Sequence, residues 1–461
     1  MNKTPDQKVA LFIATLAAFF IPFMGSSVNI AIPTIGEHFG MDAVSLSWVA
    51  TSFLLAAAMF LLPFGRLADI HGRKRVFAWG IAIYTLASFL SAVAPSGLTL
   101  ILFRGLQGLG GAMIFSTGIA ILTSVYPQEE RGKVLGFSVG AVYLGLSFGP
   151  SIGGFLTEQF GWRSVFLVHV PIGLLIVSLI AAKLKGEWAD ARGESFDWVG
   201  SLIYTVSLMG VVYGLSLLPQ ALGGWLALAG AAGLILFVGW ELRVDSPLMN
   251  IKLFQTSTVF AYSNLAALIH YSATFSVGFL LSLYLQYIPG YGAQNAGIIL
   301  IAQPIVMAVF SPYAGRLSDR IEPRMVASIG MALTALGLFL LVLIDGRTGV
   351  GMVIANLVLL GIGFALFSSP NTNAVMSSVD KKYFGVASGT LGTMRLTGQM
   401  LSMGIATLIF AVYIGRVQIT PEQYPMFLKS TQVAFLVSGF LCVAGILASL
   451  ARGRLRAATR G

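Results

Sequence analysis

Charged residues are scarce in this sequence, and it contains one cysteine. Only 10% of its 461 residues are charged and 56% are hydrophobic, whereas soluble globular domains average about 25% charged and about 45–50% apolar residues. So few charges cannot cover the surface of a soluble enzyme of this length, and the composition also excludes a disordered chain or a collagen-like repeat. The single cysteine, Cys442, excludes an internal disulfide and a cysteine-based metal cluster.

Long apolar runs separated by charged or Gly/Pro-rich loops fill the chain instead. A helical membrane span takes about 20 residues, and fourteen such runs can be counted. They cover residues 9–33, 44–64, 76–95, 97–125, 133–157, 164–182, 198–218, 223–240, 256–287, 293–314, 325–344, 348–372, 383–413 and 430–451. We expect an all-α integral membrane protein with 14 transmembrane helices, whose first run is too long for a signal peptide.

The lysines and arginines predict the orientation. With both termini in the cytoplasm, 22 of them fall in cytoplasmic segments, four in outer loops, and two, Arg104 and Arg395, within spans. This asymmetry accounts for the formal net charge of +10 without nucleic acid. Short loops and the absence of a targeting extension favour the inner membrane of a prokaryote.

An internal repeat divides the chain. The sequence GRLAD at 65–69 recurs as GRLSD at 315–319, and similar residues continue beyond it. Two related helical halves are typical of secondary transporters, with a substrate site near the midplane where the halves meet. We expect an N-terminal six-helix half over 1–186, a linker with two inserted helices over 187–253, and a C-terminal six-helix half over 254–461.

The repeated loop contains a carboxylate that can hold two helix ends together and so stabilise one conformation. Its carboxylate, Asp69, can sit on the N-terminus of a neighbouring helix, where free N–H groups favour negative charge. A plain basic cytoplasmic loop would explain Arg73, Lys74 and Arg75 but not the Gly and Asp positions or their repeat.

Two further strings lie within spans. Arg104 is followed by Gln107, Gly108 and Gly111. A midspan arginine costs about 2.5–3.5 kcal/mol on insertion scales, so it faces a cavity or a partner. The string 145–154 has the pattern GLSFGPSIGG, which predicts a bent, closely packed hinge helix, although glycine and proline are common in membrane helices generally.

These three strings, in this order, resemble the major facilitator superfamily. The strings around 161–173, Asn29 to Pro33, Leu283 to Gln286 and Ala387 to Gly389 are similar to its fourteen-helix drug:proton antiporter family. The resemblance implies alternating-access export of hydrophobic, often cationic compounds in exchange for protons. It implies gating by Gly65, Asp69, Arg73, Gly149, Pro150, Gly154, Gly315 and Asp319, and proton coupling through Arg104. No cofactor is expected, because the proton gradient supplies the energy.

The sequence departs from that family at Met24, where an aspartate is usual, and none of the 18 acids lies in the middle of a span. A cavity with two fixed arginines and no acid should attract anions. We therefore expect a neutral, zwitterionic or anionic substrate. The alternative is that both arginines are structural and bind backbone carbonyls.

A proton carrier is then needed. His270 lies in the middle of the run 256–287, and histidine titrates near neutral pH. It can equally be a packing residue, and Asp69 and the acids at the span ends are the other candidates.

Midspan polar residues provide candidate substrate contacts. They are Asn29, Gln107, Asn264, Tyr271, Gln303, Arg395 and Gln399. Arg395 and Gln399 belong to a polar stripe on the run 383–413 that must face protein or water rather than lipid. Whether the stripe contacts substrate or only a neighbouring helix stays open.

We therefore expect a secondary active transporter, a proton-coupled efflux antiporter of hydrophobic small molecules. The alternative is an uptake or exchange permease for an organic anion or zwitterion, and a non-transporting membrane sensor is a third reading. An enzyme and a metal site are not expected, because the spans contain no metal-ligand pattern and no paired acids. The expected partners are a small-molecule substrate and the lipid bilayer, with no nucleic acid, for a monomeric protein.

Overall fold

The computed structural model describes residues 5–380 and 383–453, and in this part of the chain the secondary structure is helical. The helices are α1 (Pro5–Phe39), α2 (Ala43–His71), α3 (Arg73–Ala92), α4 (Gly97–Val125), α5 (Gln128–Phe160), α6 (Arg163–Leu167), α7 (His169–Lys183), α8 (Trp198–Leu217), α9 (Ala221–Glu241), α10 (Lys252–Thr256), α11 (Thr258–Thr274), α12 (Ser276–Tyr287), α13 (Ala293–Leu300), α14 (Ala302–Arg320), α15 (Pro323–Leu341), α16 (Val350–Ser377), α17 (Phe384–Tyr413) and α18 (Tyr424–Ala451), with a short 3₁₀ helix at Pro421–Gln423.

Fourteen of the described segments are long and apolar enough to cross a membrane, which confirms the predicted fold class. Some helices extend beyond the apolar runs: the first run, 9–33, lies within α1, which covers Pro5–Phe39. The added turns place charged residues at the helix ends, where a membrane-spanning helix meets water.

Three spans are each made of two consecutive helices, a feature that the runs did not reveal. Proline explains two of the breaks, since it lacks an N–H and its ring collides with the carbonyl one turn earlier. Pro171 follows the break between α6 and α7, and Pro304 follows the break between α13 and α14. At the third break, the N–H of Ser276 donates to Oγ of Ser402 on α17 at 3.0 Å instead of continuing the helix.

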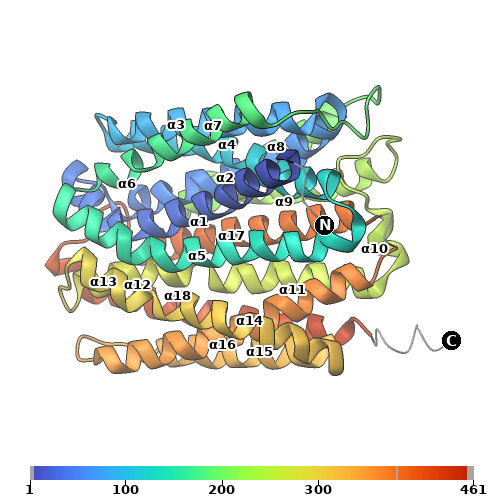
Figure 1. The fold of residues 1–461 in the computed structure, drawn as a ribbon. Coiled ribbons are helices and arrows are strands. Elements are labelled where there is room, and N and C mark those ends of the chain that lie inside the picture. Colours follow the sequence, from blue (N-terminus) through green and yellow to red (C-terminus); the bar gives the residue numbers. More distant parts are fainter. Residues whose placement is uncertain (1–4, 381–382, 454–461) are drawn as a thin grey trace.

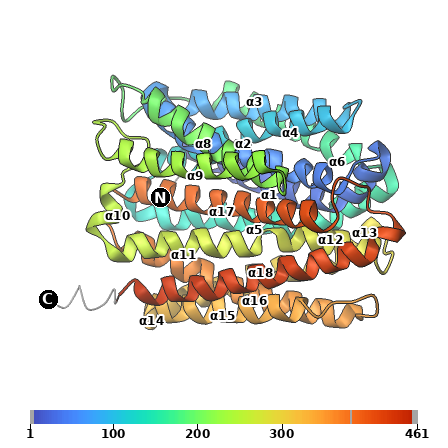
Figure 2. The ribbon, with the colours of Figure 1, turned by 180° about the vertical axis from the view of Figure 1, so that it is seen from behind.

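The helices form one elongated bundle, with the N-terminal half (blue to green) stacked on the C-terminal half (yellow to red) (Figure 1). Both termini lie at the end where α10 is found, which we call the terminal end; the distal end carries α6 and α13. The inserted helices α8 and α9 lie near α17 on the side of the bundle that faces away from the viewer in Figure 1 and toward the viewer in Figure 2.

The inserted helix α8 contacts one helix of each half. Tyr204 Oη donates to the carbonyl oxygen of Ala58 on α2 at 3.2 Å, and Val212 and Leu215 lie against Gly404 of α17. Helix α9 packs on α8 and carries exposed apolar side chains, including Ile235. This pair therefore covers the seam between the halves on that side and presents α9 to lipid.

The internal repeat is visible in the packing. Gly80 of α3 packs against Met113 and Gly110 of α4, and its repeat partner Gly330 of α15 packs against Gly363 and the following turns of α16. In both halves a side chain at this glycine would collide with the neighbouring helix.

Candidate functional site

At the distal end the two halves are joined by hydrogen bonds between helices α1 and α12. Ser282 Oγ donates to the carbonyl oxygen of Asn29 at 2.8 Å, and Gln286 Nε2 donates to that of Ile30 at 3.0 Å. Ser47 of α2 and Thr407 of α17 share a hydrogen bond of 2.8 Å in the same region. We call this set of contacts between the halves the distal closure. Asn29, which was predicted to contact substrate, contributes its backbone carbonyl to it.

Glycines of α5 and α13 let these two helices, one from each half, approach closely. A Cβ atom at Gly154 would collide with the carbonyl oxygen of Ala293, and one at Gly297 of α13 would collide with that of Pro150. The other face of α5 packs on α1, where Ser27 Oγ donates to the carbonyl oxygen of Gly149 at 2.9 Å. Helix α5 continues through Pro150 without a break and packs closely on both sides, as the string predicted, while its bending as a hinge stays a prediction.

A carboxylate completes this distal closure. Glu158, in the last turn of α5, accepts a hydrogen bond from the backbone N–H of Gln294 at 2.9 Å. Gln294 lies in the first turn of α13, which belongs to the other half. An anion there is favoured by the free N–H groups and by the helix dipole.

Near the middle of the bundle, hydroxyl groups and one arginine form a central polar cluster of Tyr143, Tyr271, Ser311, Ser368, Thr372 and Arg395. Tyr143 of α5 accepts a hydrogen bond from Ser311 of α14 at 3.2 Å, which joins the halves. Tyr271 Oη and Ser368 Oγ lie 3.5 Å apart.

Arg395 gives the central polar cluster its positive charge. Its NH2 group donates to Thr372 Oγ1 at 2.5 Å, and its guanidinium lies 5.7 Å from the ring centre of Tyr271. Its Nε is buried without a hydrogen-bond partner among the described residues. The cluster contains no described carboxylate, so it suits an acceptor from a ligand.

The cluster unites two predicted residues, Tyr271 and Arg395, with four that the sequence reasoning missed. Gln399 lies one helical turn beyond Arg395 on α17, and Gln303 is partly exposed on α14. Tyr143 precedes the glycine-rich string of α5 by a few residues, which was the one available signal for it.

Arg104 and Gln107 lie outside this cluster, within the N-terminal half. Arg104 Nε donates to the carbonyl oxygen of Val49 on α2 at 3.0 Å, and NH1 bonds Gln107 Oε1. Gln107 Nε2 in turn donates to Ser88 Oγ on α3 at 2.7 Å. Both side chains are buried, and in this conformation they bind α2 and α3, as the structural alternative for Arg104 supposed.

His270 and Asn264 are buried on α11, and the His270 ring lies 6.0 Å from the ring of Tyr271, which belongs to the cluster. The His270 ring packs at a tilt against Phe367 with ring centres 4.0 Å apart, and neither ring nitrogen has a hydrogen-bond partner among the described residues. Asn264 Nδ2 donates to the carbonyl oxygen of Phe260 on its own helix at 2.9 Å. Proton carriage by His270 and substrate contact by Asn264 stay predictions.

The loop motif at the terminal end binds the linker. Arg73 makes ion pairs with Asp69 at 2.7 Å and with Asp190 at 2.8 Å. Arg66 pairs with Glu194 at 2.5 Å, which lowers the pKa of that carboxyl. The expectation that Asp69 would cap a neighbouring helix is not met here, because the arginine one turn later takes its carboxylate.

The repeated motif differs in its contacts. Asp319 Oδ1 accepts a hydrogen bond from Asn373 Nδ2 of α16 at 3.3 Å. Gly315 lies close to Ser369 of the same helix. The repeated motif at 315–319 therefore contacts α16, whereas Arg66 and Arg73 of the first motif pair with the linker.

Comparison with known sequences identifies the class. The sequence model of the family described as Major Facilitator Superfamily matches residues 14–262 and again residues 263–460. The chain belongs to this superfamily, and it is a membrane transporter rather than an enzyme.

Several relatives carry names that describe transport. The multidrug resistance protein Stp of Mycobacterium tuberculosis is 31% identical over 90% of this chain and 77% of its own length. The cephamycin export protein CmcT of Amycolatopsis lactamdurans is 33% identical over 88% of this chain and 85% of its own. The riboflavin transporter RibZ of Clostridioides difficile is 27% identical over 95% and 96%. These similarities support the drug:proton antiporter type.

A solved structure shares the fold. The inward-facing, unoccupied form of a bacterial homologue of the human lysosomal transporter Spinster superposes with a TM-score of 0.71 over 98% of both chains, at 15% sequence identity. At that identity the likeness concerns the fold alone.

Proposed function

We propose that this transporter is a proton-coupled efflux antiporter that exports hydrophobic small molecules by alternating access. We place both termini in the cytoplasm of a prokaryote, with the protein a monomer in the inner membrane. The distal end is then the outer face. The observation that carries the proposal is the closure of that face by α5 and α13 above the central polar cluster, which leaves loading to the cytoplasmic side.

The names of relatives support export. Two of the compared proteins are named for multidrug resistance and for cephamycin export. The glycine-rich packing of α5 supports the same direction, because the resemblance of that string is to antiporters. Alternating access would separate α5 from α13 and open the cluster to the outside.

The substrate that fits the central polar cluster is neutral, zwitterionic or anionic. Arg395 keeps a buried Nε–H without a partner and has hydroxyl groups around it. Because a buried donor without an acceptor costs free energy, a carboxylate or carbonyl on the substrate would be stabilised there. A permanent cation would meet repulsion from the same group.

We infer that His270 carries the exchanged proton. In the closed-outside state a second ring proton would have no acceptor, since neither nitrogen has a partner in the part of the chain that the structure describes. A conformation that hydrates the ring would favour protonation. Coupling of proton and substrate transport requires such a difference in the protonation of His270 between the two conformations. Arg104 would act by holding α2, α3 and α4 together, and Asp69 by releasing Arg73 when the terminal end closes.

The test is accumulation of ethidium and of an anionic dye of similar size in energised everted vesicles. The proposal expects accumulation of the anionic dye that an uncoupler abolishes and that Arg104→Ala removes. Arg104→Lys, which keeps the charge, separates loss of folding from loss of function. Tighter binding of ethidium than of the anionic dye by purified protein would contradict the proposed substrate charge.

A second candidate is an uptake or exchange permease for an organic anion. The unpartnered Nε of Arg395 favours it, and one relative is named a riboflavin transporter. Accumulation in right-side-out vesicles, with none in everted ones, would select this function.

A further inference from the structure

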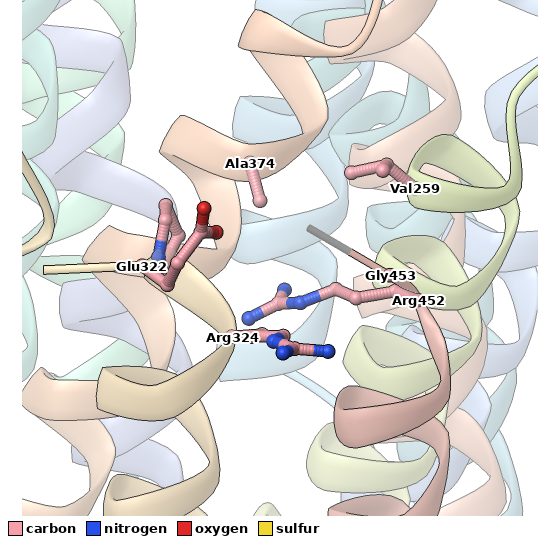
Figure 3. Close-up of a pocket in the computed structure, with 7 residues that line it drawn as sticks. Val259, Glu322, Arg324, Ala374, Arg452 and Gly453 are labelled. Carbon is pink, nitrogen blue, oxygen red and sulfur yellow. The ribbon is translucent and has the colours of Figure 1, made fainter. Parts of the chain in front are cut away.

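Two arginine side chains at the terminal end of the C-terminal half point into one small pocket, whose lining residues are not those of the central polar cluster (Figure 3). The pocket lies between α11, α15, α16 and the end of α18. Arg324 comes from the first turn of α15, and Arg452 directly follows α18.

Arg452 is almost fully enclosed, with 1% of its surface exposed. Its NH1 group donates to Ser263 Oγ at 3.2 Å and to Asn371 Oδ1 at 3.0 Å. Asn371 Nδ2 donates in turn to the carbonyl oxygen of Ser263 at 3.0 Å, so these two residues fix NH1 between α11 and α16. The Nε and NH2 groups of Arg452 have no partner among the described residues.

The pocket carries an excess of positive charge. The Nε of Arg324 is also buried without a partner in the described part of the chain. Glu322 is the one acid that lines the pocket, against two guanidinium groups. Burial, and then the neighbouring Arg324, lower the pKa of Arg452 to about 10. Three buried nitrogen atoms of charged groups thus lack an acceptor among the described residues, which is costly unless an anion supplies one.

We propose that this pocket binds a phosphate group, held by the forks of Arg324 and Arg452 at the N-terminus of α15. A phosphate offers several acceptor oxygens and matches the planar guanidinium fork, and the first turn of α15 adds the favourable end of its dipole. Arg324 is partly exposed, so its long side chain can rotate to admit the group.

The surroundings of the pocket suit the phosphate of a membrane phospholipid. Met325 and Ile329 of α15 and Leu447 and Leu450 of α18 are exposed apolar side chains on the two helices that carry the arginines. Acyl chains would lie along these helices while the headgroup occupies the pocket at the level of the membrane surface. Free phosphate offers the same acceptor oxygens but has no acyl chains to contact the apolar side chains.

Native mass spectrometry of the detergent-solubilised full chain tests the site. The probes are phosphatidylglycerol, phosphatidylcholine and inorganic phosphate. We expect wild type to retain phosphatidylglycerol, and Arg324→Gln to lower that affinity about tenfold by removing a charge-assisted contact. Arg324→Gln leaves the bonds of Arg452 to Ser263 and Asn371 intact. Arg452→Lys, checked for an unchanged unfolding temperature, should lower the affinity too.

The matched control is Arg320→Gln, which removes an exposed arginine at the same end that does not line the pocket. This variant should bind phosphatidylglycerol like wild type. Binding of inorganic phosphate alone, lost in Arg324→Gln, would also support the site and would identify free phosphate as its ligand. Equal binding by wild type and Arg324→Gln, or an equal loss in Arg320→Gln, would overturn the proposal.

Discussion

The carboxylate of Glu158 lies 2.9 Å from the backbone nitrogen of Gln294, so the last turn of α5 in the N-terminal half caps the first turn of α13 in the C-terminal half. This contact is exposed to the distal side, where the helix dipole is screened by water. Beneath it, Gly154 and Gly297 allow the backbones of α5 and α13 to touch. A weak polar latch above a close-packed seam is suited to a closure that must open in each cycle.

Loss of the charge at Glu158 should loosen the distal closure. Glu158→Gln keeps the shape and an oxygen acceptor but loses the attraction to the helix end, which is worth about 0.3–1 kcal/mol. A cysteine placed at Ser282, in a Cys442→Ser background, should then react about two- to fivefold faster with a charged thiol reagent added from the distal side. Glu422→Gln, which removes another exposed carboxylate at that end, should leave the rate unchanged, and a change of equal size there would count against a latch.

A methyl group added at the seam should prevent full closure. Gly154→Ala would place a Cβ into the carbonyl of Ala293, and Gly297→Ala would do the same at Pro150. Both variants should slow transport by about tenfold or more while expressing normally, because the closed state becomes strained. Gly140→Ala on the same helix has open space for its methyl group and should transport at the wild-type rate. Normal transport by both seam variants would show that this contact is not part of the cycle.

Arg395 should decide the charge preference of the substrate. Arg395→Gln keeps polarity near Thr372 but removes the positive charge, so affinity for an anionic dye should fall about tenfold while a neutral analogue is unaffected. Equilibrium binding to purified protein measures both. Arg347→Gln changes an exposed arginine in the loop between α15 and α16, and should bind both dyes normally. An unchanged anion affinity in Arg395→Gln would place the substrate elsewhere.

His270 should set the pH dependence of transport. His270→Gln is similar in size and cannot take up a proton, so the change in transport rate between about pH 6 and pH 8 should flatten. The exposed His71→Gln serves as the control and should keep the wild-type profile. If the His270→Gln profile is the same as that of wild type, this residue has no part in coupling and Asp69 becomes the next candidate.

The number of spans and the repeat could be predicted because membrane helices need long apolar runs and both halves retain the same glycines. The helix breaks were not predicted, although Pro171 and Pro304 in the sequence are a physical signal for two of the three. The break before Ser276 could not be predicted, since it depends on a hydroxyl group supplied by Ser402 far along the chain.

The site was harder to predict than the fold. Tyr143 and Ser311 come from different halves and meet only through the relative placement of α5 and α14. Arg104 was expected to act in proton coupling, but one of its two acceptors, the carbonyl of Val49, belongs to the backbone, so the sequence gives no signal for this contact. Arg73 pairs with Asp69 and, through the same NH2 group, with Asp190 of the linker, a contact that depends on how the linker folds back on the loop.

The most direct test is to measure proton and substrate fluxes together in proteoliposomes of known orientation, with an anionic dye and a pH-sensitive probe. The account predicts that adding dye drives protons in the opposite direction to the dye, and that His270→Gln uncouples the two. Dye movement that is independent of the proton gradient, or protons that move in the same direction as the dye, would contradict it.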